Sequence, residues 1–203
     1  MKKEKTALIK VDPQKDFYHR RGSLMVKGGD EVVEPLNDLD RQVDLSVVTR
    51  DWHKLGSVHF AKNRNDGKGW VIHCVENTWG AEFHPDLNLK NVTVFSKGMD
   101  PKDDGGYSGF EGVNENGTKL GDFLKKQGVT TVVVGGLATD YCVKATVLDA
   151  LKLGFKVVVA YHAIRAVNLQ PDNGKKAVKE MKKAGAIFVT TDDFSDALQK
   201  DLE

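Results

Sequence analysis

The chain has 203 residues, which is enough for one sizeable domain with its own hydrophobic core. Its 30 Lys and Arg residues nearly balance its 29 Asp and Glu residues, so the net charge of +1 gives no electrostatic footprint for nucleic acid or an anionic membrane. No apolar run approaches the ~20 residues that span a bilayer, and two cysteines are too few for a disulfide framework. We therefore expect a cytoplasmic protein with reduced thiols and a small-molecule partner.

Apolar, β-branched segments recur at wide spacing and predict six strands. These segments cover residues 6–12, 44–51, 91–98, 129–138, 155–163 and 186–191. Near-continuous apolar runs of this kind are typical of strands that are covered on both faces. Helical patterns with Thr or Asp at the start and Gly at the end follow the expected capping preferences. They cover residues 118–128, 139–154 and 172–185, and a short last helix is expected over 195–203.

The alternation of strands and helices predicts an α/β fold made of right-handed βαβ units. We expect a three-layer α/β/α arrangement with a mainly parallel, doubly wound, six-stranded sheet. Two long, weakly periodic segments, 52–90 and 99–117, interrupt the alternation, and long loops in compact domains are usually functional. The sequence shows no internal repeat, linker or low-complexity tract, so residues 1–203 are expected to form a single domain.

Four reactive side chains lie at the ends of predicted strands. Asp12, Asp51 and Lys97 close the first three strands, and Cys142 follows the fourth, in the first turn of the next helix. Taken singly, each has an ordinary explanation as a turn former, a solvated lysine or a small core residue. Because ligands of open α/β sheets bind at the carboxyl ends of the strands, the coincidence of all four favours a catalytic site.

Cys142 is the candidate nucleophile, in the segment GGLATDYC. The helix dipole favours a thiolate at this position. A nearby acid could take the thiol proton and pass it to a leaving group, and a nearby lysine would support the thiolate. Asp12 and Lys97 would fill these roles if their strands lie beside the fourth strand. Backbone N–H groups of the same turn could bind an oxyanion.

The segment TRDWHKLGSVHF, residues 49–60, contains most of a candidate metal site. Two of its polar side chains are two residues apart and share a face of an extended chain, and a glycine then lets the chain turn back. One carboxylate and three imidazoles suit Zn²⁺, Fe²⁺ or Mn²⁺. The alternative is a set of surface polar residues. The four candidates are Asp51, His53, His59 and His73.

Two further residues of the same loop are interpreted as structural. Cys74 is adjacent to His73, so in an extended chain it points to the opposite face and packs inside, without a disulfide to Cys142. His84, in the segment EFHPD, is interpreted as a structural or surface histidine.

Taken together, these segments resemble the nicotinamidase/pyrazinamidase branch of the isochorismatase-like hydrolases. The resemblance runs in order through residues 6–165, in the blocks ALIKVDPQKDF, TRDWHKLGSVHF, HCVENTWGAEFHPDL, FSKGMDPKDDGGYSGFEG and GGLATDYCVKATVLDA. Family members often read VDVQNDF at the first block, whereas here Pro13 and Lys15 intervene. Pro13 favours an extended backbone at Asp12.

The resemblance implies a role for each candidate residue. The catalytic triad would be Asp12, Lys97 and Cys142. The metal ligands would be Asp51, His53, His59 and His73, and the aromatic wall of a pyridine pocket would be Phe17, Trp70 and Tyr107. The oxyanion hole would be formed by the backbone N–H groups of Ala138 and Cys142, with a cis peptide bond between Leu137 and Ala138.

The implied activity is metal-dependent hydrolysis of nicotinamide to nicotinate and ammonia through a cysteine thioester, a step of NAD salvage, with pyrazinamide as a further candidate substrate. Zinc is favoured over iron or manganese as the single bound ion, which would hold the pyridine nitrogen. Isochorismatases lack the cysteine, and other amide-cleaving members generally lack the histidines, whereas this sequence has both. A related cysteine hydrolase of another small amide and a non-enzymatic metal-binding α/β module remain alternatives, and the oligomeric state stays open.

Overall fold

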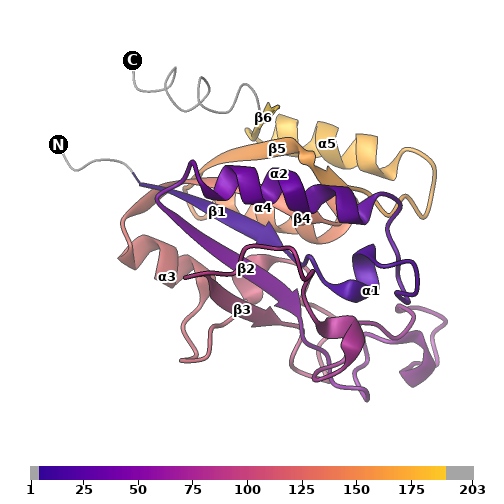
Figure 1. Cartoon of the computed structure of the whole chain (residues 1–203). Helices are drawn as coiled ribbons and strands as arrows, with labels where there is room; N and C mark the ends of the chain where they lie inside the picture. Colours follow the sequence, from indigo (N-terminus) through magenta and orange to yellow (C-terminus); the bar gives the residue numbers. More distant parts are fainter. Residues whose placement is uncertain (1–4, 191–203) are drawn as a thin grey trace.

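The computed structural model describes residues 5–190 (Figure 1). Six strands of this part of the chain form one sheet in the order β3-β2-β1-β4-β5-β6, and every neighbouring pair is parallel. The strands are β1 (Lys5–Val11), β2 (Leu45–Asp51), β3 (Thr93–Lys97), β4 (Val129–Leu137), β5 (Lys156–Arg165) and β6 (Ile187–Val189). The strand order reverses direction between β1 and β4, which is where ligands bind in doubly wound sheets.

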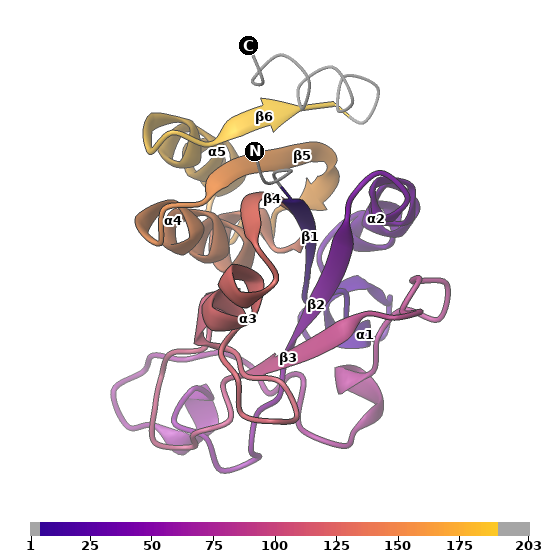
Figure 2. The ribbon, with the colours of Figure 1, turned by 90° about the vertical axis from the view of Figure 1, so that its left-hand side faces the viewer.

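Helices cover both faces of the sheet. They are α1 (Lys15–Tyr18), α2 (Val33–Asp40), α3 (Leu120–Lys126), α4 (Lys144–Lys152) and α5 (Asn173–Lys183). Shorter turns are the 3-10 elements η1 (Gly29–Val32), η2 (Ala61–Asn63), η3 (Trp79–Ala81) and η4 (Gly109–Glu111), and the π-helical turn η5 (Thr139–Val143) that leads into α4. Figure 2 shows α3, α4 and α5 on one side of the sheet and α1 and α2 on the other.

Two hydrophobic cores follow from this layering, because successive strand residues point to opposite faces. Ala7 and Ile9 of β1 pack into the core beneath α3, α4 and α5, together with Met181. Leu8 of the same strand packs into the other core, together with Leu36 of α2. The near-continuous apolar runs of the strands are therefore explained by burial on both faces.

The expected α/β/α fold with six strands is confirmed. The segments 52–90 and 99–117 do form long connections that hold only single-turn helices. Much of both lies at the carboxyl edge of the sheet, and the end of the first runs back along the sheet to the start of β3 (Figure 1). The sequence patterns gave no sign of α2, because it is short, has Pro35 in its first turn and lacks a glycine after its end. The last helix expected over 195–203 lies outside the described residues.

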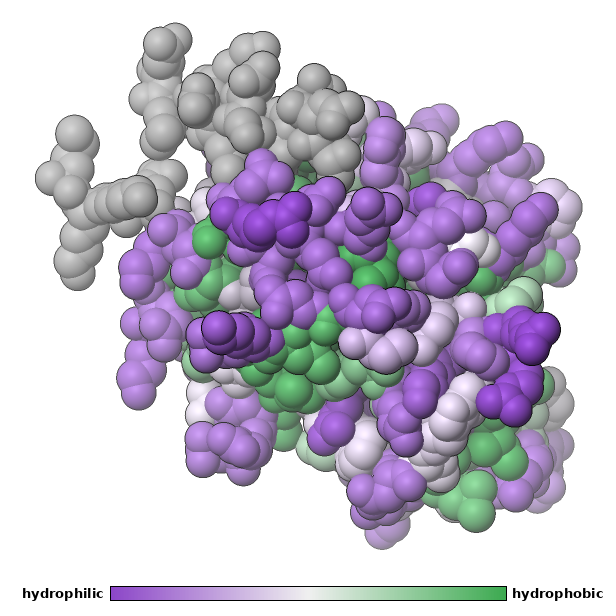
Figure 3. Space-filling view, in the orientation of Figure 1, coloured by the Kyte–Doolittle hydropathy of each residue, from purple (hydrophilic) through white to green (hydrophobic). Residues whose placement is uncertain are grey.

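The face that carries α2 is largely polar, with apolar side chains visible between the charged ones (Figure 3). Within residues 5–190, no helix is both long and apolar enough to cross a membrane.

Candidate active site

The carboxyl edge of the sheet brings the four reactive side chains together. Asp51 at the end of β2 is the register partner of Lys97 at the end of β3. Asp12 directly follows β1, and Cys142 lies in η5, directly after β4. Asp12, Asp51 and Cys142 each bring one ligand-type atom within 4.8 Å of the others.

Lys97 is the central cation of this cluster and is fully buried. Its Nζ lies 2.8 Å from Asp12 Oδ2 and 3.5 Å from Cys142 Sγ, and it donates to Asp51 Oδ1 and to the Gly106 carbonyl. Burial opposes the charge on Lys97, but the two carboxylates outweigh it and hold the pKa of this lysine well above its usual range. The site therefore contains a permanent cation between two acids and a thiol.

Asp12 is oriented by Thr49 of β2. The Thr49 hydroxyl donates to Asp12 Oδ1 at 2.6 Å, and the Asp12 backbone N–H donates back to it at 3.3 Å. Burial raises the pKa of Asp12, the Lys97 charge opposes that rise, and the Asp51 carboxylate adds to it. A carboxyl with a raised pKa that is fixed beside a thiol is suited to accept and return a proton near neutral pH.

The backbone at Asp12 differs from the expectation. Pro13 was expected to hold Asp12 extended, but the residue adopts a left-handed conformation with φ of 46°. The chain turns at once into α1, and the N–H of Gln14 donates to the Asp12 carbonyl at 2.8 Å. This tight turn overrides the local proline preference.

Cys142 lines the pocket beside Ala138, and the peptide bond between Leu137 and Ala138 is cis, as expected. Burial raises the pKa of the Cys142 thiol well above its usual range, the Lys97 charge opposes the rise, and the acids Asp12 and Asp51 add to it. Burial therefore favours the protonated thiol, which agrees with the expected role of Asp12 as the base that removes its proton.

Three histidines converge beside Asp51. One ring nitrogen of each lies within 4.8 Å of the others, and all three rings are buried. The His53 and His59 rings stack with centroids 4.5 Å apart. The Nε2 atoms of His53 and His73 lie 3.8 and 3.7 Å from Asp51 Oδ2. The structure thus brings together the four candidate metal ligands that the sequence placed on one loop.

The Nδ1 atom of each histidine faces a backbone carbonyl, at 3.0 Å for His53, 3.4 Å for His59 and 2.8 Å for His73. A carbonyl only accepts, so each Nδ1 carries a proton, which leaves Nε2 as the ring nitrogen that can bind a metal ion. The carbonyl that faces His53 belongs to Gly98, where an added Cβ would lie 2.3 Å from the His53 ring at a φ of 67°. Only glycine fits at this contact.

These residues fit a divalent metal ion. His53 Nε2 is buried and has no hydrogen-bond partner among the described residues, which is costly unless it binds a ligand. Burial, with the neighbouring imidazoles, lowers the pKa of His59 to about 4, so that ring is neutral. Burial opposes ionisation of Asp51, but Lys97 and the histidines hold its pKa well below the usual range. Imidazole and carboxylate groups are ligands that zinc prefers.

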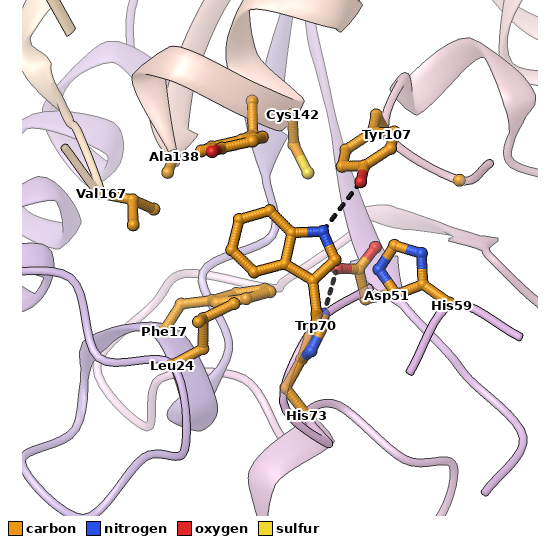
Figure 4. Close-up of a pocket in the computed structure, with 12 residues that line it drawn as sticks. Phe17, Leu24, Asp51, His59, Trp70, His73, Tyr107, Ala138, Cys142 and Val167 are labelled. Carbon is orange, nitrogen blue, oxygen red and sulfur yellow. Dashed lines mark hydrogen bonds and ion pairs between the residues drawn. The ribbon is translucent and has the colours of Figure 1, made fainter. Parts of the chain in front are cut away.

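A pocket of about 380 Å³ opens between the thiol and the histidines (Figure 4). The aromatic residues Phe17, Trp70 and Tyr107 line it, as expected. Trp70 Nε1 donates to the Tyr107 hydroxyl at 2.8 Å. The Phe17 and His73 ring centroids lie 5.5 Å apart. Its aromatic and apolar walls suit a small planar ligand.

Sequence reasoning missed several residues of the site. Leu24, Tyr141 and Val167 also line the pocket. Tyr141 directly precedes Cys142, whereas Leu24 and Val167 come from segments without a chemical motif. Gln14 holds the Asp51 backbone from both sides, because its Nε2 donates to the Asp51 carbonyl at 2.8 Å and its Oε1 accepts from the Asp51 N–H at 2.7 Å. In the sequence, the position of Gln14 two residues after Asp12 was the one indication that it belongs to the site.

Cys74 and His84 lie outside the chemical site, as expected. Cys74 is a free, buried thiol in the core beside α2. Its backbone is left-handed, with φ of 43°, so the extended-chain argument for its direction was wrong although the conclusion holds. The His84 ring packs against Tyr18 in a tilted arrangement, with ring centroids 4.3 Å apart.

Replacing Cys74 with serine is expected to leave ammonia release unchanged and to lower the free energy of unfolding by about 1 kcal/mol, because a hydroxyl enters an apolar core. Urea denaturation and a steady-state assay measure both effects. A linked Cys74–Cys142 peptide in the mass spectrum of the non-reduced protein would contradict this assignment.

Comparison with known proteins identifies the family. The family model described as isochorismatase domain matches residues 6–193. The chain belongs to the isochorismatase domain family. It is 40% identical to the nicotinamidase/pyrazinamidase of Mycobacterium tuberculosis, over 90% of this chain and 97% of that protein.

Two solved structures are similar to the chain over most of its length. The pyrazinamidase of Pyrococcus horikoshii, solved in complex with zinc, superimposes with a TM-score of 0.80 at 38% identity and covers 92% of this chain and 99% of its own. A protein from L. infantum, PnC1 in complex with nicotinate, has a TM-score of 0.82 at 33% identity and covers 93% of each chain.

Proposed function

We propose that this isochorismatase-domain protein hydrolyses nicotinamide to nicotinate and ammonia through a thioester on Cys142. The observation that carries the proposal is the convergence of Cys142, Asp12 and Lys97 on one side of a pocket whose other side holds the histidine cluster. A nucleophile, a base and a cation lie together there, next to a set of metal ligands. The nicotinamidase name of the Mycobacterium tuberculosis relative and the nicotinate in the L. infantum structure support this substrate.

The pocket would orient the substrate before the chemistry begins. The pyridine ring would lie between Phe17 and Trp70, with its carboxamide toward Cys142. Asp51, His53, His59 and His73 would hold one divalent ion, which when bound supplies a Lewis acid for the pyridine nitrogen. Fixing the ring in this way supplies several kcal/mol of the barrier reduction by orientation alone.

Acylation uses groups of this chain. Asp12 takes the proton of the Cys142 thiol, and the thiolate attacks the carboxamide carbon while the carbonyl π electrons move to oxygen. The backbone N–H groups of Ala138 and Cys142 hold that oxyanion. Asp12 then returns the proton to the nitrogen, the C–N bond breaks, and ammonia leaves with a thioester on Cys142.

Deacylation reverses the proton movement. Asp12 removes a proton from a water molecule, whose oxygen attacks the thioester carbon. The C–S bond breaks, nicotinic acid leaves, and the proton returns from Asp12 to the sulfur. Lys97, 2.8 Å from Asp12 Oδ2 and 3.5 Å from Cys142 Sγ, stabilises whichever of the two is charged.

The proposal extends to a second substrate, the identity of the metal ion and the cellular role of the protein. Pyrazinamide, which also carries a carboxamide on a flat nitrogen ring, would fit the same pocket. Zinc is the favoured ion. We further propose that the chain works as a single cytoplasmic domain in NAD salvage.

Metal removal tests the proposed function. We expect the purified protein to contain a divalent metal, to release ammonia from nicotinamide, to lose that activity on chelation and to regain it when zinc is added. Full activity of the metal-free protein would contradict the metal role. Activity on other small amides but not on nicotinamide would favour the alternative of a different cysteine amidase.

Replacing Tyr107 with phenylalanine removes the acceptor of the Trp70 indole N–H. The loss of one partly buried hydrogen bond, worth about 1 kcal/mol, is expected to raise the KM for nicotinamide roughly fivefold while kcat changes little. Steady-state kinetics measure kcat and KM separately. Tyr161→Phe is the matched control, because Tyr161 is exposed. A fall in kcat with an unchanged KM would show that Tyr107 acts on the chemical step instead.

A further inference from the structure

Asp16 is a buried carboxylate at the edge of the site that the proposed reaction does not use. It lies in α1 and is 8% exposed. The two oxygens of its side chain accept hydrogen bonds from backbone N–H groups of two different segments, at Cys74 and at Ser23. A buried carboxylate that is satisfied by two distant backbone groups fixes both of them relative to its own helix.

The first of these bonds acts on the histidine cluster. Asp16 Oδ2 accepts from the Cys74 N–H at 2.7 Å, which is the amide that follows His73. The Cys74 carbonyl in turn accepts from the His53 N–H at 3.1 Å. Cys74 is left-handed, a conformation that is uncommon for a non-glycine residue and needs support from its surroundings. Asp16 therefore holds the peptide that links His53 to His73.

The second bond acts on the substrate pocket. Asp16 Oδ1 accepts from the Ser23 N–H at 3.1 Å, and the Asp16 carbonyl accepts from the Leu24 N–H at 3.1 Å. Leu24 lines the pocket, and so does Phe17, the residue after Asp16. Figure 4 shows Phe17 and Leu24 side by side, with His73 nearby. One carboxylate thus connects the apolar wall to the histidine cluster.

Gly80, in η3, packs directly against the Asp16 carboxylate. A Cβ at Gly80 would lie 2.0 Å from Asp16 Oδ2 and 2.4 Å from its Cγ, so no side chain fits there while Asp16 keeps its position. Gly80 belongs to a different segment from Cys74 and Ser23, so this close packing is an independent restraint on the position of the Asp16 carboxylate.

We propose that Asp16 is a positioning residue that sets both the metal affinity of the histidine cluster and the geometry of the pyridine wall. This inference rests on the proposed function. Groups that orient metal ligands from outside commonly change metal affinity about 10- to 100-fold when they are removed. The Asp16 carboxylate orients His73 and His53 through the Cys74 backbone, and it holds Leu24 through the backbone N–H of the preceding residue, Ser23.

Zinc affinity, measured by competition with a chromogenic chelator, tests the inference without relying on activity. Asp16→Ala is expected to weaken zinc binding about 10- to 100-fold and to raise the KM for nicotinamide, while saturating zinc restores most of kcat. Asp16→Asn keeps one acceptor and should fall between Asp16→Ala and the wild type. Asp86→Asn, at an exposed carboxylate, is the control. Wild-type zinc affinity and KM in folded Asp16→Ala would overturn the inference.

A double-mutant cycle with Gly80 keeps the test independent of a general loss of stability. Gly80→Ala alone should weaken zinc binding, because the methyl group displaces the carboxylate. On the Asp16→Ala background the same change should have little further effect, since the clash is gone. Gly56→Ala is the matched control, because a Cβ there meets nothing within 4 Å. Additive effects of the two changes on zinc affinity would overturn the inference, and a wild-type protein that binds zinc but leaves nicotinamide intact would refute the proposed function alone.

Discussion

Replacing Cys142 with alanine is expected to lower the rate of ammonia release from nicotinamide by at least about 10⁴-fold, because removal of the nucleophile from a catalytic triad leaves only binding and oxyanion stabilisation. The fold and the metal content should be retained, since the change deletes one small side chain and leaves Lys97 paired with Asp12 and Asp51. Steady-state assays, circular dichroism and metal analysis measure the three quantities.

Cys74→Ala is the matched control for that variant, because Cys74 is the second buried, free cysteine. It should keep nearly all of the activity. Turnover close to the wild-type rate in Cys142→Ala, with the protein folded and loaded with metal, would exclude covalent catalysis at Cys142.

Loss of a metal ligand should have the second largest effect. His53→Ala removes a buried ring whose Nε2 has no other partner among the described residues, and we expect it to weaken metal binding by more than about 100-fold and to reduce activity with it. Asp51→Ala should do the same and also destabilise the fold by about 3–5 kcal/mol, because the buried Lys97 loses one of its two carboxylates.

His84→Ala is the control for the ligand variants, since His84 packs against Tyr18 and is not one of the clustered histidines. It should keep its metal. Stoichiometric metal in His53→Ala together with metal loss in His84→Ala would show that the ligand assignment is wrong.

The sequence predicted the catalytic edge well because parallel strands end on the same side. The strand pattern placed Asp12, Asp51 and Lys97 at one edge of the sheet, and the structure brings them into contact. The strand of Lys97 was expected to lie beside the fourth strand, but β2 and β1 separate β3 from β4, and Lys97 Nζ nevertheless lies 3.5 Å from Cys142 Sγ. The histidines were harder to place, since spacing along a loop does not fix its path. Their convergence depends on contacts with distant segments, such as the Gly98 carbonyl that faces His53.

Other features were beyond sequence reasoning because they arise from tertiary packing. Burial raises the pKa of the Cys142 thiol, an effect that the helix-dipole argument leaves out. The turn at Asp12 overrides the preference of Pro13. Asp16 was one of several acids in an ordinary stretch, and only the folded chain shows that it joins the Cys74 and Ser23 backbones.

The most direct test of the account is acid quenching of the enzyme during turnover of saturating nicotinamide, followed by mass spectrometry of the peptide that contains Cys142. We expect a nicotinoyl group on Cys142 that appears with substrate and disappears when the substrate is exhausted. A Cys142 peptide that stays unmodified at every quench time while nicotinate accumulates, or a nicotinoyl group on a different residue, would contradict a thioester mechanism at this site.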